Sequence, residues 1–105
     1  MPNTVTTLNK NAYESCNTLT TVTLSLGLQA IPDNAFRDCG SLVDVPLPPS
    51  LVSIGTGAFE QCRSLTSVNM PNTVTTLNNS AYYVCTNLKE VKLSENLKNI
   101  GDASF

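Results

Sequence analysis

A solenoid of stacked 23-residue repeats is the fold class that the sequence predicts. Four cysteines, Cys16, Cys39, Cys62 and Cys85, recur at that spacing, as do the aromatic residues Tyr13, Phe36, Phe59, Tyr82 and Phe105. Residues 1–23 and 70–92 are also identical at 14 of 23 positions. A fixed period of this length is typical of repeat architectures, in which each unit buries its apolar side against its neighbours.

The period divides the chain into four complete repeats, residues 1–23, 24–46, 47–69 and 70–92, and a partial fifth repeat at 93–105. Because Met1 and Phe105 both lie inside the repeat pattern, we expect one array that is part of a longer one. An apolar content of 41% is typical of a folded chain.

Each repeat contains three kinds of apolar spacing. Residues 19–24 end in alternation with β-branched residues, which predicts a short strand. Pro48 and Pro71 then predict a turn, because proline fixes φ and cannot donate a hydrogen bond. Residues 5–8 indicate a second extended segment, and residues 12–16 have helical spacing. We therefore expect a short parallel β-sheet on one face, with extended segments and helical turns on the other.

Composition argues against several classes of function. The net charge of −2, with 13% charged residues, provides no basic stripe for nucleic-acid phosphates. No apolar run approaches the roughly 20 residues that cross a bilayer, and no signal peptide is recognisable. We expect neither a nucleic-acid partner nor a membrane span.

One repeat carries the residues of a known family. The pattern Ile54-Gly55, Ala58-Phe59, Cys62, Leu65 and Val68 resembles the BspA-like class of leucine-rich repeats, and the resemblance covers the whole chain. It implies an extracellular or surface-attached repeat region of mucosa-dwelling bacteria and anaerobic protozoa, used for adhesion to host proteins or other cells. Where the family has Ile-Gly, this chain has Leu8-Asn9, Ile31-Pro32 and Leu77-Asn78, which leaves the local turn geometry open.

The cysteine spacing bears on three alternatives. Zinc sites use close pairs such as Cys-x-x-Cys, and no two cysteines here are nearer than 23 residues. Neighbours in a stack would lie one strand spacing apart, but with Cβ atoms near 4.8 Å, beyond the roughly 3.8 Å typical of a disulfide. The pattern favours buried free thiols over a disulfide or a metal site. It indicates no cofactor.

The sequence contains few residues that could support catalysis. The chain has no histidine, and its cysteines lie in core columns without an activating partner. Asp44 and Glu90 share a predicted outward column with Ser67 between them, about 10 Å apart by strand spacing, which is loose for a carboxylate pair. We predict that the chain is not an enzyme.

Three further patterns concern the surface. Glu14, Arg37 and Glu60 share one column, which predicts a ladder of alternating charge, and Lys10 should stack beside Asp33. Pro46 removes one backbone donor from the second strand, so the sheet should be weak there. The tripeptide that begins at Asn78 matches an N-glycosylation acceptor.

The outward residues of the strands form the predicted binding face: Thr20, Thr21, Thr23, Val43, Asp44, Pro46, Thr66, Ser67, Asn69, Lys89, Glu90 and Lys92. The leading hypothesis is a non-enzymatic surface module that engages protein or glycan partners through this face by weak, repeated contacts. The alternative is a structural subunit that stacks end to end. Both termini of the array are apolar, so we also expect self-association.

Overall fold

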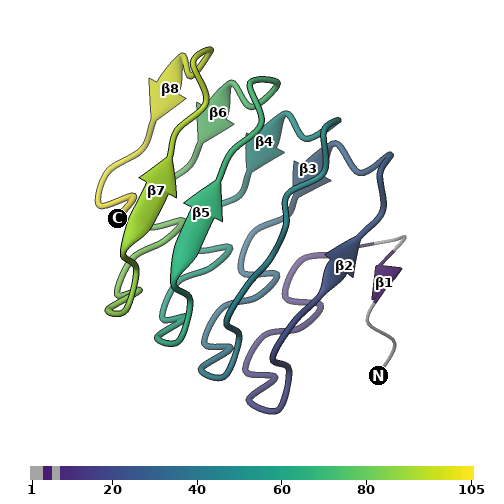
Figure 1. Cartoon of the computed structure of the whole chain (residues 1–105), viewed down its shortest axis with the longest axis vertical. Coiled ribbons are helices and arrows are strands. Elements are labelled where there is room, and N and C mark those ends of the chain that lie inside the picture. The colour runs from purple at the N-terminus through teal and green to yellow at the C-terminus, as the bar shows by residue number, and fades with distance from the viewer. Residues whose placement is uncertain (1–3, 6–7) are drawn as a thin grey trace.

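The computed structural model, which describes residues 4–5 and 8–105, is a solenoid in which each repeat runs along two β-sheets and returns through a turn (Figure 1). The front side carries two two-stranded sheets, which together we call the front sheet: β1 (Thr4–Val5) pairs with β2 (Thr23–Leu24), and β5 (Ser67–Asn69) pairs with β7 (Glu90–Lys92). The back sheet contains β3 (Ala30–Ile31), β4 (Ser53–Ile54), β6 (Thr76–Leu77) and β8 (Asn99–Ile100). The third side, which we call the turn side, has no regular element among the described residues.

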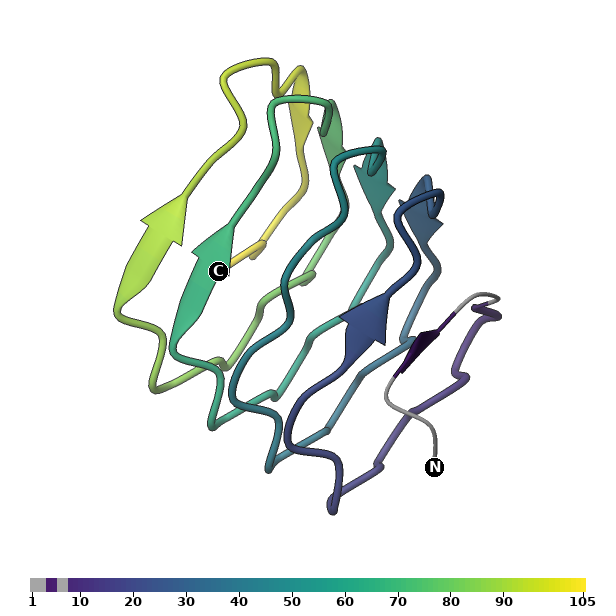
Figure 2. The same cartoon turned by 45° about the vertical axis from the view of Figure 1, so that its right-hand side comes forward.

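The back sheet is the more continuous of the two. Its four strands pair in parallel in the order β3-β4-β6-β8, each offset by one repeat. Ile31, Ile54 and Leu77 are its fully buried inward residues. The sequence indicates these segments as extended but not as a sheet, because each contributes only two paired residues. Figure 2 shows this sheet behind the front strands.

The front sheet is interrupted in the second repeat, as Pro46 predicts. There, a single bridge joins Thr21 to Asp44, and no strand forms over residues 43–47. Within the described chain, one backbone hydrogen bond connects this segment to the following front strand, from Thr66 N to Val43 O at 3.3 Å. The prediction of a strand over 19–24 is too long, since β2 has two residues.

The N-terminal strand departs from the repeat. The 23-residue period aligns Val5 with Leu28, but β1 pairs with β2 through Thr4↔Thr23 and Val5↔Leu24. The alignment of Val5 with the second extended segment is therefore wrong. The segment instead extends the front sheet by one strand.

The predicted helical turns are wrong. Within the described residues the chain has no helix, and residues 33–38 form successive turns in which Asn34 and Asp38 have φ near +60°. Left-handed residues end a right-handed helical run. The backbone N–H groups also alternate between acceptors in the same repeat and acceptors in the next repeat. Ala35 N donates to Pro32 O within its repeat, whereas Phe36 N donates to Ala58 O of the next repeat at 2.8 Å. Sequence spacing alone does not distinguish this pattern from a helix.

The core is built from columns that continue from repeat to repeat. The rings of Tyr13, Phe36, Phe59, Tyr82 and Phe105 form one stack, with centroids 5.1–5.5 Å apart and interplanar angles of 4–7°. Ala35 and Ala58 beside them are fully buried. Each repeat thus completes the core of its neighbours, as the period predicts.

Contacts between repeats explain why the two Ile-Gly pairs contain glycine. A Cβ atom on Gly55 would lie 2.6 Å from Asp33 N, because the Asp33 side chain folds over the next repeat and accepts a hydrogen bond from Thr56 N at 2.8 Å. Asn79 makes the same bond to Asp102 N, opposite Gly101. Glycine is therefore required where the preceding repeat carries this Asp or Asn side chain.

Candidate functional site

Polar side chains at the corners of the solenoid are engaged in structure. Ser50 Oγ donates to Leu26 O at 2.6 Å, Thr73 Oγ1 to Pro49 O at 3.1 Å, and Asn96 Nδ2 to Asn72 O at 2.7 Å. Each bond reaches back to a carbonyl group 24 residues earlier, so each fixes one repeat on the preceding one. These side chains are not free to bind a partner.

Several charged side chains on the turn side are also paired. Arg37 lies 3.6 Å from Glu14 and 3.8 Å from Glu60, and Lys10 lies 3.8 Å from Asp33. These contacts confirm both charge columns predicted from the sequence. Because the groups are partly exposed, each pair contributes about 0.2–1 kcal/mol and mainly holds the repeats in register.

The front face differs from both of these sides. Among the residues predicted to bind, Ser67 and Thr66 are half-buried and the others are exposed: Thr20, Thr21, Thr23, Val43, Asp44, Pro46, Asn69, Lys89, Glu90 and Lys92. Within the described part of the chain, their side chains make no hydrogen bond or ion pair. The structure thus brings the predicted residues together on one surface and leaves their polar atoms available.

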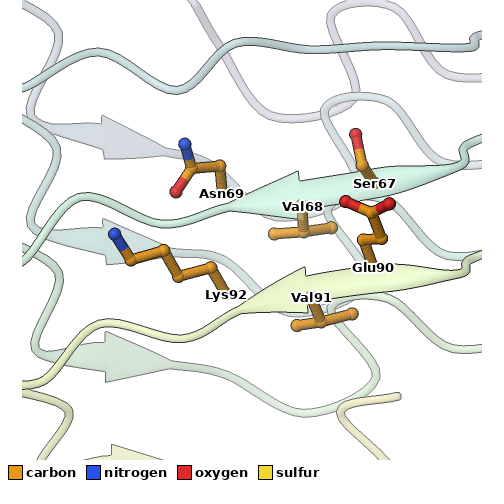
Figure 3. Close-up of a pocket in the computed structure, with 6 residues that line it drawn as sticks. All are labelled: Ser67, Val68, Asn69, Glu90, Val91 and Lys92. Carbon is orange, nitrogen blue, oxygen red and sulfur yellow. The ribbon is translucent and has the colours of Figure 1, made fainter.

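Two adjoining hollows lie on this face. The first, of about 440 Å³, is lined by Ser67, Val68, Asn69, Glu90, Val91 and Lys92. Figure 3 shows Ser67 beside Glu90 and Asn69 beside Lys92, all on the outer side of the two strands. The second hollow, of about 320 Å³, is lined by Asp44, Val45, Pro46, Leu47, Ser67 and Asn69. The sequence gives no signal for either hollow, since both depend on how side chains of neighbouring repeats lie on the sheet surface.

The thiols are held by the backbone. The Sγ atoms of Cys39, Cys62 and Cys85 donate to the carbonyl groups of Tyr13, Phe36 and Phe59 at 3.0–3.2 Å. Burial raises the pKa of the Cys39 thiol to about 11. Burial likewise raises the pKa of Cys85 to about 11, and that of Cys62 still further. All four cysteines are free.

These raised pKa values work against nucleophilic chemistry, because the thiolate is the reactive form. In the described residues, no three His, Cys, Asp or Glu side chains are grouped so that they could hold a metal ion. A search of the same residues also finds no helix with the length and apolar character of a membrane span.

Asn78 is half-buried at the end of β6. Its Nδ2 atom, to which glycosylation would attach a sugar, donates a hydrogen bond to Ile54 O at 2.9 Å. Glycosylation replaces one of the two Nδ2 hydrogens, so modification of the folded chain would have to fit a sugar beside this contact between repeats.

Comparison with known proteins agrees with the repeat architecture. A family model for the BspA type leucine rich repeat region, in six copies, matches residues 1–105. No curated protein matches the chain significantly in sequence.

Two solved structures are similar. The crystal structure of a leucine-rich repeat protein from Bacteroides ovatus is 28% identical with a TM-score of 0.84, and the match covers 94% of this chain and 27% of that one. The leucine-rich repeat protein of T. pallidum shares the fold, at 22% identity and a TM-score of 0.52, over 93% of this chain and 66% of that one. The chain thus spans about a quarter of the Bacteroides protein. Since the family model covers its full length, the chain belongs to the BspA-type leucine-rich repeat family.

Proposed function

We propose that this chain is a non-enzymatic binding module that engages a protein or glycan through its front face. The observation that carries the proposal is that exposed polar side chains of the front face border two adjoining hollows and have no partner among the described residues. Several polar side chains at the corners and on the turn side, in contrast, are bonded to the fold. Buried, protonated thiols add no catalytic group.

The setting that we propose is the cell surface, where the module would support adhesion. This part of the proposal is supported by the family, whose resemblance implies surface-attached repeats that contact host proteins or other cells. The front face has no aromatic residue among its described outward positions. Because tight interfaces usually rely on Trp, Tyr or Arg anchors, we expect weak contacts that gain strength from repetition.

A cell-binding assay tests this proposal. The variant Asp44→Ala, Ser67→Ala, Glu90→Ala should bind cultured epithelial cells at least tenfold less than the natural chain. A matched control, Thr56→Ala, Glu95→Ala, Asp102→Ala, removes the same chemical groups from other exposed positions and should bind normally. Both variants should fold, since surface changes cost no more than about 0.5 kcal/mol each. Equal binding by the two variants would exclude the front face as the site.

We also propose that the 105-residue chain self-associates end to end. Ile100 is 58% and Phe105 47% exposed, whereas Leu77 and Phe59, their equivalents within the stack, are fully buried. A hollow of about 430 Å³ with a mainly apolar lining lies beside Phe105, bordered by Tyr82, Cys85, Leu88, Lys89, Val91, Leu93 and Phe105. Such a surface typically mediates association.

Light scattering on a dilution series tests self-association. The natural chain should form species larger than 11.2 kDa at micromolar concentration, and Ile100→Asp should shift it towards the monomer. A natural chain that is monomeric throughout the series would contradict the proposal.

A further inference from the structure

The front face carries opposite charges in its second and fourth repeats. Asp44, in the second repeat, is the only charged residue of its hollow, whereas Lys89, Glu90 and Lys92 lie together in the fourth repeat. We propose that the front face recognises a protein segment that runs across the strands and places a basic side chain at Asp44 and an acidic side chain at Lys92. This inference rests on the front face being the binding site.

The surroundings of Asp44 suit a lysine or arginine side chain. Pro46 and Leu47 offer an apolar surface along which the aliphatic part of such a side chain can lie. Ser67 and Asn69 supply two further acceptor oxygens beside the exposed carboxylate. Asp44 forms no ion pair within the described residues. A basic group at this position would therefore gain charge-assisted hydrogen bonds without displacing an existing one.

The hollow over Asp44 lies where the front sheet is interrupted. Pro46 cannot donate a hydrogen bond to a neighbouring strand. The segment 43–47 is joined to the next front strand by one backbone bond, whereas β5 and β7 pair over three residues. Pro46 itself lines the hollow, together with the unpaired carboxylate of Asp44.

The fourth repeat offers the complementary end. Lys89 and Lys92 outnumber Glu90, so this part of the face has a net positive charge. Lys92 lies beside Asn69, whose amide group can donate a second hydrogen bond to a carboxylate (Figure 3). Two strand spacings across the sheet and two residues along the strand separate Asp44 from Lys92, so the two positions lie about 12 Å apart. The flexible side chain of Lys92 lets it meet a charge somewhat nearer to Asp44. A neutral glycan would leave both ends without a counter-charge, which favours protein.

A short synthetic peptide tests the inference directly. Ac-Lys-Pro-Pro-Glu-NH2 forms a polyproline II helix, which places its two charges on the same side, roughly 9 Å apart. Titrated into the ¹⁵N-labelled chain, it should shift the amide resonances of Asp44, Ser67, Asn69 and Lys92. The neutral peptide Ac-Gln-Pro-Pro-Gln-NH2 should cause no such shifts.

Matched variants identify the contacts. Asp44→Asn should weaken binding of the charged peptide about three- to fivefold, as expected for an exposed ion pair. Asp102→Asn, which removes an exposed acid elsewhere, should leave the affinity unchanged. Asp44→Lys should reverse the preference, so that Ac-Glu-Pro-Pro-Glu-NH2 binds more tightly than the Lys-Glu peptide.

Several results would overturn the inference. They are the absence of shifts at millimolar peptide, shifts that map away from the front face, and shifts that Asp44→Asn does not reduce. Front-face shifts caused by a neutral oligosaccharide and unaffected by Asp44→Asn would assign the face to a glycan instead. In each case the cell-binding experiment judges the proposed function separately, since it does not depend on this peptide.

Discussion

Substitution of Gly55 by alanine should destabilise the array strongly. The added methyl group would lie 2.6 Å from Asp33 N and 2.7 Å from the Pro32 carbonyl carbon, and neither backbone atom can move aside alone. Overpacking of this kind costs about 1–3 kcal/mol. Opening the contact would also weaken the bond from Thr56 N to Asp33 Oδ1, which contributes about 1 kcal/mol or more. We therefore expect a total loss of about 2–4 kcal/mol.

Urea unfolding at a fixed protein concentration measures this loss. Gly27→Ala is the matched control, because a Cβ atom at that position has no neighbour within 4 Å. The control should change the free energy of unfolding by less than about 1 kcal/mol, and it can be stabilising because alanine restricts the unfolded chain. If Gly55→Ala and Gly27→Ala unfold at the same urea concentration, the close approach of the two repeats is refuted.

Three further predictions concern the core and the turn side. Ala58→Leu should cost about 1–3 kcal/mol in thermal unfolding, because Ala58 is fully buried between repeats; a loss near zero would mean that its column faces solvent. The folded chain raises the pKa of Cys39 from 9.0 to about 11, so the unfolded chain loses this proton first. The free energy of unfolding should therefore fall as pH rises from 9 to 11, and the fall should be smaller in Cys39→Ala; equal slopes would contradict it. Arg37→Gln should lower the free energy of unfolding by no more than about 1 kcal/mol in low salt and by almost nothing in 1 M NaCl, because salt screens its ion pairs. A loss that is the same in low and high salt would contradict this prediction.

The sequence predicts the stacking of this molecule well. Columns separated by 23 residues become real contacts, including the aromatic stack and the ion pairs of Arg37. The effect of Pro46 on the front sheet is also predictable, because a missing N–H group has the same consequence in any strand. Contacts between equivalent positions need no knowledge of the path of the chain within one repeat.

The path within one repeat is predicted less well. Residues 12–16 have helical spacing, yet Asn11 and Ser15 adopt φ near +60°. Their N–H groups donate to Asp33 and Arg37 of the next repeat. Helical hydrogen bonding competes here with bonding between repeats, and apolar spacing is the same in both cases. The hollows of the front face are likewise unpredictable, because they depend on how side chains of neighbouring repeats lie on the sheet surface.

The bonds from the thiols to backbone carbonyls have a consequence for where the fold can exist. Cysteine-rich small proteins usually depend on an oxidising compartment, because disulfides stabilise them. Here, the thiols of Cys39 and Cys62 contribute as buried hydrogen-bond donors in their reduced form. The array therefore makes its core contacts with the cysteines in the reduced form. A regular column of cysteines in such an array indicates packing between repeats, and carries no information about the compartment in which the protein works.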